Sequence, residues 1–294
     1  MRIFGICLIR NEIDIIERTL LDALRWIDCV WVLDHESDDG TWQLLQDRFG
    51  RNPKVVLVGR ATGPFRDGLR AIAYDAARAY AKKGDWWCRL DSDEFYIDDP
   101  REFLAGVPSA YDVVKAASFQ YYFTEKDAIE YSLNPSAYRE GRSVEALKHY
   151  ACNSSEARFV RHRDKDWGAD NLWPDSAFPS WIWRKHIRLK HFQYRYPEQI
   201  QSRLDLRAAT ISGNQFKHEL RSDWGSHIGG NVRIKRQEGE QRPNQTWEER
   251  VVQSTNLELD RGDGDYRIRP EMLDRIPGAL EQTARRVAKW LLRR

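Results

Sequence analysis

Apolar and polar positions in the first hundred residues or so follow two alternating patterns: short apolar runs and stretches with helical spacing. The apolar runs predict buried strands at residues 3–9, 29–34, 54–59 and 85–91. The helical spacing predicts helices at residues 12–27, 41–49 and 69–84, the last of them ending at Gly84. Such alternation is typical of βαβ units around a mainly parallel sheet, so we expect an α/β fold.

The pattern is less regular in the second part of the chain. A long strand is predicted at 111–123, strand-like alternation returns at 181–194, and a helix over 197–210 opens with a proline. Residues 124–180 show little periodicity and hold many aromatic and basic side chains. A segment of this length without regular elements is usually functional or partly disordered.

The C-terminal part combines a polar stretch with an amphipathic one. Residues 236–250 are typical of a linker, and residues 278–294 predict a helix with one apolar face. That helix also carries five basic residues, Arg285, Arg286, Lys289, Arg293 and Arg294. We expect it to dock on the domain; the alternative is peripheral contact with an anionic membrane surface, and nucleic acid is a weaker third interpretation.

Composition limits the function classes. The 47 Lys and Arg residues nearly balance the 45 Asp and Glu residues, and the formal net charge of +2 gives no general electrostatic case for a nucleic-acid partner. No apolar stretch approaches the roughly 18 residues of a membrane span, and the N-terminus resembles a core strand more than a signal peptide. We therefore expect a cytoplasmic protein. The cysteines lack C-x-x-C spacing, which favours buried thiols over zinc or disulfides: Cys7, Cys29, Cys88 and Cys152.

Three polar clusters follow predicted strands. They are "RNE" at 10–12, "DHESDDGT" at 34–41 and "DSDE" at 91–94. Open sheets of this kind bind ligands at the carboxyl ends of their strands, where the loops gather. The coincidence predicts one site built from all three clusters.

Asp91 and Asp93 stand two apart at a strand end, which predicts that both side chains point to the same side. Two adjacent hard oxygen donors suit Mg²⁺ or Mn²⁺, ions that keep open positions for substrate phosphates. The alternative is a solvated acidic loop. In either case Asp98 and Asp99, ahead of Pro100, are expected to close the turn and cap the next helix.

The second cluster also has two interpretations. Ser37, Asp38 or Asp39 is expected to cap the helix that begins near Thr41. A functional use of Asp34 is compatible with capping, because a carboxylate at this edge can accept hydrogen bonds from a nucleobase or a ribose.

Three blocks, "CLIRNEIDIIERTL", "VLDHESDDGTW" and "DWWCRLDSDEFY", resemble in order and spacing the opening blocks of the bacterial family-2-like glycosyltransferases of the GT-A fold. A weaker likeness covers "IRLKHFQYRYPEQIQSR". The resemblance implies a GT-A (Rossmann-like) mixed, mainly parallel sheet flanked by helices. It also implies a nucleotide-sugar-binding half at 1–108, an irregular acceptor-side half at 109–232, and a linker with a C-terminal helical extension at 233–294.

The resemblance further implies a donor site. Glu12 and Asp34 would line the nucleotide pocket, and Asp91 and Ser92 would contact the donor. Many family members carry a second acidic residue directly after the first in the second block, whereas this chain has His35 there. The departure leaves the identity of the base open.

A metal site is the second implication. Asp91 and Asp93 would hold Mn²⁺ or Mg²⁺ under the diphosphate of the donor, with Glu94 in a supporting role. His191 would be the third ligand; the alternative is a packed or hydrogen-bonded core histidine. Arg66 and Arg70, at the start of the helix before this strand, could add positive charge at the phosphates, although either could belong to a solvated helix face.

The catalytic base is expected in the loop at 163–176. An acceptor hydroxyl benefits from a carboxylate base, and inverting members of the family place one beyond the D-x-D. Asp170 is the first candidate because Trp167 and Trp173 flank it, and Asp166 is the second. Asp164 and Asp175 lie in the same loop. Packing is the favoured role for each tryptophan taken singly, although some of the twelve are expected to line an acceptor groove.

These features together predict a metal-dependent glycosyltransferase, inverting by family habit, that acts on a glycan or lipid-linked acceptor in bacterial surface-polysaccharide synthesis. One alternative is a sugar-1-phosphate nucleotidyltransferase, although the first strand ends in "RNE" rather than in a Gly- and Arg-rich loop. Another is a non-catalytic glycan- or nucleotide-binding module. The sequence leaves the sugar, the base, the acceptor, the stereochemistry and the oligomeric state open.

Overall fold

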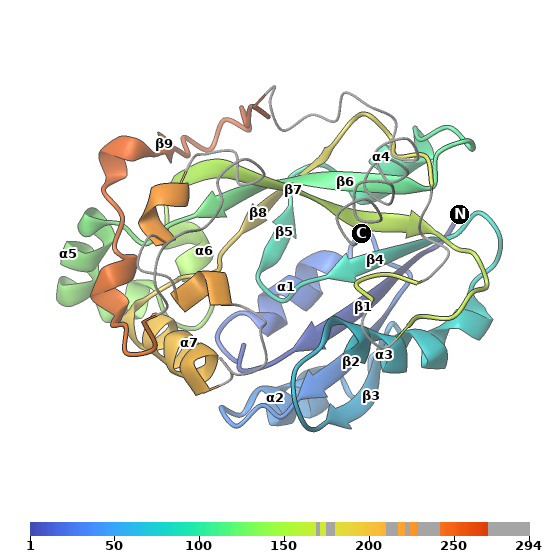
Figure 1. Cartoon of the computed structure of the whole chain (residues 1–294), viewed down its shortest axis with the longest axis horizontal. Helices are drawn as coiled ribbons and strands as arrows, with labels where there is room; N and C mark the ends of the chain where they lie inside the picture. Colours follow the sequence, from blue (N-terminus) through green and yellow to red (C-terminus); the bar gives the residue numbers. More distant parts are fainter. Residues whose placement is uncertain (169–170, 175–179, 210–216, 221–223, 229–241, 270–294) are drawn as a thin grey trace, which may run out of the picture.

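A computed structural model describes residues 1–168, 171–174, 180–209, 217–220, 224–228 and 242–269 of the chain. Over these residues the protein has an α/β structure, in which helices flank one mixed sheet of nine strands (Figure 1). The strand order is β3-β2-β1-β4-β7-β6-β8-β5, and β9 pairs with β7. The expected α/β class is confirmed.

Four parallel strands form the N-terminal half of the sheet: β1 Ile3–Ile9, β2 Cys29–His35, β3 Val55–Ala61 and β4 Trp86–Leu90. β1 pairs with β2 and with β4, and β2 pairs with β3. Every residue of β1 is buried, because helices cover both faces of this half of the sheet. The four strands predicted from apolar runs are confirmed, with small differences at their ends.

Three helices connect these strands: α1 Ile16–Ala23, α2 Thr41–Phe49 and α3 Arg70–Ala77. α1 and α2 pack on one face of the sheet around Trp26, and α3 packs on the other face beside Trp31 and Trp87. The helix predicted to reach Gly84 ends at Ala77. The 3₁₀ turn that follows, η2 Arg78–Tyr80, has no buried residue, and tertiary packing is what sustains a short helix.

The second half of the sheet is mixed and contains β5 Glu94–Tyr96, β6 Val113–Tyr121, β7 His149–Arg161, β8 Ile187–His191 and β9 Glu258–Leu259. β7 runs antiparallel to both β4 and β6 and joins the two halves. The strands expected near β6 and β8 are confirmed. β7 was not predicted, because charged residues such as Glu156 and the buried Arg158 interrupt its apolar pattern.

The remaining α-helices are α4 Pro100–Ala105, α5 Glu125–Leu133, α6 Ser143–Ala146 and α7 Pro197–Ala209. The other 3₁₀ turns are η1 Asp67–Leu69, η3 Pro135–Ala137, η6 Lys217–Leu220, η7 Trp224–His227, η8 Trp247–Arg250 and η9 Ser254–Asn256. α5 begins at a capping box between Thr124 and Asp127. α7 confirms the helix expected from Pro197.

The segment 242–269 packs against the second half of the sheet. Trp247 and Tyr266 join the apolar core around β6 and β8. Asp260 accepts hydrogen bonds from Lys190 Nζ at 2.9 Å and from the Tyr121 hydroxyl at 2.5 Å. The stretch 242–250 is therefore structured, contrary to the expected linker.

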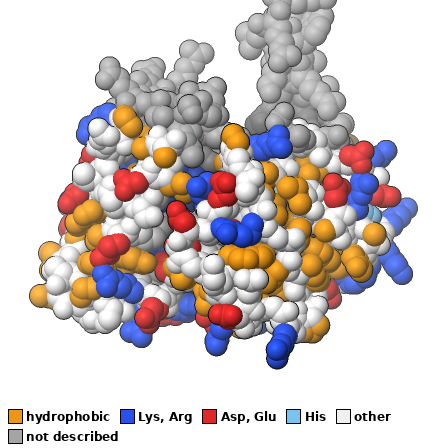
Figure 2. Space-filling model, turned by 90° about the horizontal axis from the view of Figure 1, so that it is seen from below, with side chains coloured by type: hydrophobic (Ala, Val, Ile, Leu, Met, Phe, Trp, Pro, Cys, Tyr) orange, Lys and Arg blue, Asp and Glu red, His pale blue; other side chains and the backbone are white. Residues whose placement is uncertain are grey.

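The C-terminal helix predicted at 278–294 lies outside the described residues. No helix within the described ranges is long and apolar enough to cross a membrane. Cys7, Cys88 and Cys152 are buried and Cys29 is partly buried, and all four are free thiols as expected. On the face drawn in Figure 2, acidic and basic side chains are interspersed, so the near-neutral charge of the chain is also balanced locally there.

The acidic residues before α4 have the structural roles expected of them. The Asp99 carboxylate accepts hydrogen bonds from the backbone N–H groups of Arg101 and Glu102, at 2.7 and 3.1 Å, with Pro100 in the first turn. Asp98 accepts from the backbone and the guanidinium of Arg188 on β8.

Replacing Asp99 with Ala should lower the free energy of unfolding by about 1 kcal/mol, because two N–H groups of α4 lose their acceptor. Urea unfolding measures the change. Asp47→Ala, on the exposed side of α2, is the matched control and should stay within about 0.5 kcal/mol of wild type. Equal stability of Asp99→Ala and wild type would contradict the capping role.

Candidate active site

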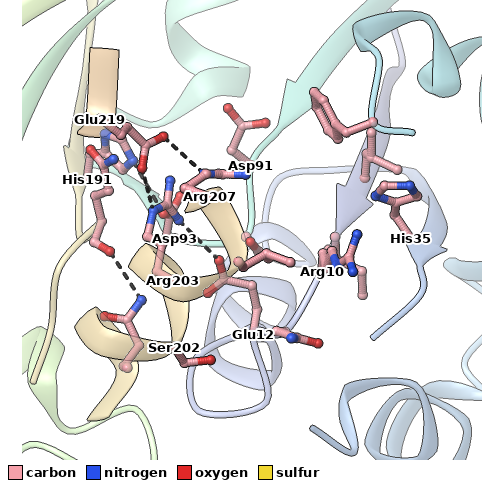
Figure 3. Close-up of a pocket in the computed structure, with 18 of the residues that line it drawn as sticks. Arg10, Glu12, His35, Asp91, Asp93, His191, Ser202, Arg203, Arg207 and Glu219 are labelled. Atoms are coloured by element: carbon pink, nitrogen blue, oxygen red, sulfur yellow. Dashed lines mark hydrogen bonds and ion pairs between the residues drawn. The ribbon is translucent and has the colours of Figure 1, made fainter. Parts of the chain in front are cut away.

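A cavity of about 700 Å³ lies at the carboxyl ends of β1, β2 and β4. Its volume is within the roughly 300–1,000 Å³ of small-molecule sites. The loops after β1 and β4 contribute Glu12 and Asp91, the last residue of β2 contributes His35, and α7 closes the opposite wall with Arg203 (Figure 3). The structure thus brings the three polar clusters of the sequence to one place. We call it the main cavity.

Asp91 lies among arginine side chains in this cavity. Its carboxylate is 3.2 Å from a guanidinium nitrogen of Arg70, 3.2 Å from one of Arg158 and 3.8 Å from Nε of Arg89. The three arginines are buried, whereas the Asp91 side chain is 25% exposed and lines the cavity. Arg70 is therefore placed as expected. Arg66 is exposed and does not line the cavity, so its predicted phosphate contact is not supported here.

Arg158 and Arg89 were not predicted from the sequence. Arg158, on β7, bonds to Glu94 and lies 3.4 Å from Glu156, while Arg89, on β4, bonds to Glu156 at 2.5 Å. Burial, together with the nearby charge of Asp91, raises the pKa of Glu94 well above its usual value. The supporting residue Glu94 is thus a buried partner of Arg158. For Arg89, the sequence signal that could have indicated a buried charge was an arginine inside the apolar strand "WWCRLD".

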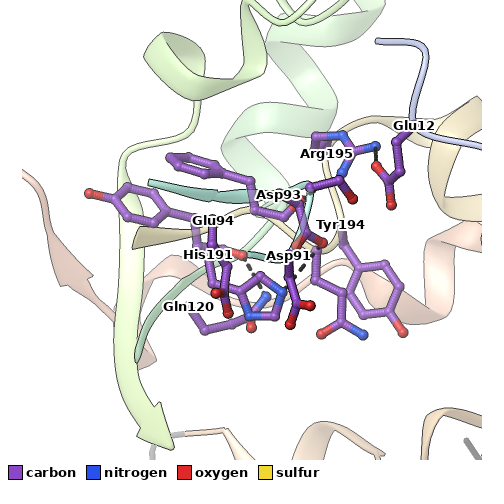
Figure 4. Close-up of polar contacts among 12 residues, drawn as sticks. Glu12, Asp91, Asp93, Glu94, Gln120, His191, Tyr194 and Arg195 are labelled. Atoms are coloured by element: carbon purple, nitrogen blue, oxygen red, sulfur yellow. Dashed lines mark hydrogen bonds and ion pairs between the residues drawn. The ribbon is translucent and has the colours of Figure 1, made fainter. Parts of the chain in front are cut away.

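Asp93 and His191 form a second pair. The Asp93 carboxylate lies 3.4 Å from Nε2 of His191 (Figure 4). Burial favours the neutral acid, but His191, Arg203 and Arg195 outweigh it and hold the pKa of Asp93 well below its usual range. For His191, burial lowers the pKa, yet the charge of Asp93 and the hydrogen bond raise it above its usual value. The expected proximity of Asp93 and His191 is present.

Glu12 also lines the main cavity and is held from behind by Arg195. The Arg195 guanidinium is fully buried and donates to Glu12 at 2.7 Å and to Asp14 at 2.7 and 2.8 Å. Burial raises the pKa of Glu12 to about 7; Arg195 opposes this shift and Asp93 adds to it. Arg195 was also missed, although it lies in the weaker likeness "QYRYPEQ".

The prediction for Asp34 needs correction. Its side chain is fully buried and accepts from the Ser37 N–H at 3.1 Å and from Arg60 Nε at 2.8 Å, so it holds the turn after β2 and does not line the cavity. Successive strand residues face opposite ways, and His35 lines the cavity instead. Among the capping candidates, Asp39 accepts from the Thr41 N–H at 2.9 Å.

The loop chosen for the catalytic base also differs from expectation. Asp166 is 86% exposed, pairs with Arg78 at 2.7 Å and does not line the main cavity. Trp167 and Trp173 are buried and stacked with ring centroids 5.9 Å apart, so they serve the core beside α3 and do not line an acceptor groove. Asp170 and Asp175 lie outside the described residues.

The cavity has a chemistry suited to a divalent cation. Among the described residues that line it, nine have carboxylate side chains and six are arginines. Asp91 and Asp93 supply hard oxygen donors that face this acidic lining, and His191 supplies a nitrogen, so the donor set fits Mg²⁺ or Mn²⁺. Over the described ranges, however, no three His, Cys, Asp or Glu side chains are already grouped for a metal. Guanidinium and imidazole groups hold the two carboxylates instead.

Comparison of the chain with protein-family models finds no matching family, and comparison with curated proteins finds no significant match. The resemblance to family-2-like glycosyltransferases therefore stays a prediction.

The stability of the protein should fall as pH rises from about 5 to about 8. The unfolded Glu12 carboxyl ionises near pH 4.5 and the folded one near pH 7, so rising pH favours unfolding across this window. The raised pKa of His191 acts in the same direction, because its stabilising contribution is complete below about pH 6.5 and is lost as pH rises through the folded pKa. Glu94, whose pKa is also raised, adds to the trend.

Urea unfolding at several pH values tests this dependence. Glu12→Gln should flatten the profile by an amount on the order of 1–3 kcal/mol across the window, and His191→Gln should flatten it in the same direction. Asp47→Asn is the control and should keep the wild-type slope. Unchanged slopes in both site variants would contradict the assigned shifts.

Proposed function

We propose that the protein is a metal-dependent glycosyltransferase of the GT-A type, which moves a sugar from a nucleotide-sugar donor to a hydroxyl of a glycan or lipid-linked acceptor. One observation carries the proposal. Asp91 and Asp93 lie together in a cavity at the carboxyl ends of β1, β2 and β4, beside buried arginines. Open α/β sheets bind their ligands at this edge.

The donor would lie along the main cavity. Figure 3 shows Arg10 and His35 on one side and Asp93, His191 and Glu219 on the other. Arg10 directly follows β1 and His35 is the last residue of β2, so we assign that side to the nucleoside. The ring of His35 is held by a 2.8 Å contact between Nε2 and the Gly63 carbonyl oxygen and packs edge-on against Phe65.

The diphosphate is assigned to the side of Asp91. During transfer, the bond between the anomeric carbon and the phosphate oxygen breaks, and the nucleoside diphosphate leaves with the electron pair. Arg70 and Arg158, which lie beside Asp91, would stabilise the negative charge that grows on that oxygen. Asp91, Asp93 and His191 would hold Mg²⁺ or Mn²⁺, which supplies a further positive charge at the diphosphate when bound.

The acceptor oxygen forms the new bond to the anomeric carbon and gives its proton to a base. Asp170, the first candidate for this base, lies outside the described residues. Peripheral membrane contact through the basic C-terminal helix stays a prediction for the same reason.

Replacing Asp91 or Asp93 with Asn should reduce donor turnover at least about a hundredfold, because the leaving diphosphate loses its main source of electrostatic stabilisation. Turnover is measured as release of nucleoside diphosphate from UDP-, GDP-, CDP- and dTDP-sugars with Mn²⁺. Thermal shifts with the matching diphosphates, with and without Mn²⁺, measure binding separately. Asp47→Asn is the control, and circular dichroism checks that each variant is folded.

Several outcomes would overturn the proposal. Full turnover by Asp91→Asn or Asp93→Asn would remove the metal and diphosphate assignment. Nucleotide binding without donor turnover under any condition would indicate a binding module. Formation of pyrophosphate from a nucleoside triphosphate and a sugar 1-phosphate would indicate a nucleotidyltransferase.

Replacing Asp166 with Asn should leave donor turnover within about twofold of wild type, since a solvent-exposed carboxylate outside the cavity cannot reach the acceptor hydroxyl. Steady-state kinetics with one donor and one acceptor test this. Arg78→Gln, which removes the partner of Asp166, should also keep donor turnover within about twofold of wild type. A loss of turnover in Asp166→Asn alone would restore the base assignment.

A further inference from the structure

A second cavity, of about 480 Å³, adjoins the main cavity. The two share Trp224 and Ile228 as lining residues, so η7 and the residue after it form a common wall. The second cavity is otherwise lined mainly by the segment that carries η8 and η9, including Gln253 and Asn256. We call it the outer cavity.

Trp224 is held in place by its neighbours. Its ring packs edge-on against Tyr194, with centroids 5.3 Å apart, and against Tyr122 at 6.2 Å. The guanidinium of Arg250 lies 4.6 Å from the ring centroid. Arg250 is itself buried and bonds to the backbone oxygen of Glu219 and to Gln245. The partly exposed indole therefore has a fixed orientation between the two cavities.

The outer cavity combines apolar and neutral polar side chains with two charged ones, Glu249 and Arg269. Trp224, Ile228 and Val252 provide apolar surface, and the exposed amides of Gln253 and Asn256 provide hydrogen-bond donors and acceptors. A sugar has the matching chemistry, because its C–H face packs on an aromatic ring while its hydroxyls bond to amides.

We propose that the outer cavity binds the glycan part of the acceptor, with Trp224 as the surface on which a sugar ring stacks. The assignment of the glycan as an acceptor rests on the proposed glycosyltransferase function. The binding of a glycan in the outer cavity does not depend on that function. The shared wall explains how a glycan in the outer cavity can direct a hydroxyl toward the donor in the main cavity. Trp224 is then a binding residue that selects the acceptor.

The test uses the full chain and neutral oligosaccharide probes: maltotriose, cellotriose and triacetylchitotriose. Saturation-transfer NMR measures their binding without any donor. Trp224→Ala should weaken binding of the best probe about tenfold or more, whereas Trp224→Phe should keep it within about threefold. Asn256→Ala should weaken it to a smaller extent. Trp181→Ala, at a tryptophan that is 47% exposed and lines neither cavity, is the matched control and should leave binding unchanged.

Thermal shifts with nucleoside diphosphates and Mn²⁺ separate the two proposals. Glycan binding that depends on Trp224 in a protein without donor turnover would support the outer cavity and overturn the glycosyltransferase. Failure of all three probes to bind the wild-type protein would overturn the glycan site. Unchanged glycan binding in Trp224→Ala would also overturn the glycan site. A Trp224→Ala variant that loses only nucleotide binding would overturn it as well. If Trp224→Ala does not fold, Trp224→Phe and Asn256→Ala decide, and equal affinity in wild type and Asn256→Ala then counts against the site.

Discussion

Charged side chains buried at the ends of the parallel strands impose the constraint on which the rest of this structure depends. Arg195 is fully buried, and its guanidinium bonds to Glu12 and Asp14, which lie 183 and 181 residues away in the sequence. Removing one member of such a group leaves an uncompensated buried charge, at a cost of about 3–5 kcal/mol. The pairing therefore fixes the loop after β1 against the segment after β8. Apolar packing builds each half of the sheet, and this ionic contact sets the width of the cavity between them.

The same constraint would allow this acidic cavity to accept the diphosphate of the proposed donor. Asp91 is held by Arg70 from α3 and by Arg158 from β7, and guanidinium groups bind carboxylate and phosphate oxygens in the same planar manner. An arriving diphosphate can thus share arginines that are already desolvated and oriented. The carboxylates they release would then need another cation, since nine carboxylates and six arginines line the cavity among the described residues. A divalent ion beside Asp91 and Asp93 restores that balance, which is a physical reason to expect metal and donor to bind together.

Local sequence patterns predicted most of the N-terminal half, and distant partners explain what they missed. The helix at 41–49 and the strand at 3–9 depend on residues close in sequence, so periodicity located both. Arg158 and Arg195 could not be found this way, because each is explained only by carboxylates from another part of the chain. Asp34 shows a different limit: a shift of one residue along a strand reverses the direction of the side chain, and a motif alone does not fix that register.

The tryptophans show why residue type alone cannot assign a binding role. Trp167 and Trp173 flank Asp170, the first candidate for the base, yet they are buried and stack on each other in the core. Trp224 differs because a buried cation, Arg250, and the edges of two tyrosines hold its ring while part of it lines both cavities. The rings of Trp167 and Trp173 are buried in the apolar core. The ring of Trp224 is held by Arg250 and stays partly exposed at the cavity wall. An aromatic ring stiffened by an arginine at a cavity wall loses little entropy when a sugar stacks on it, and that property separates a binding residue from a packing residue.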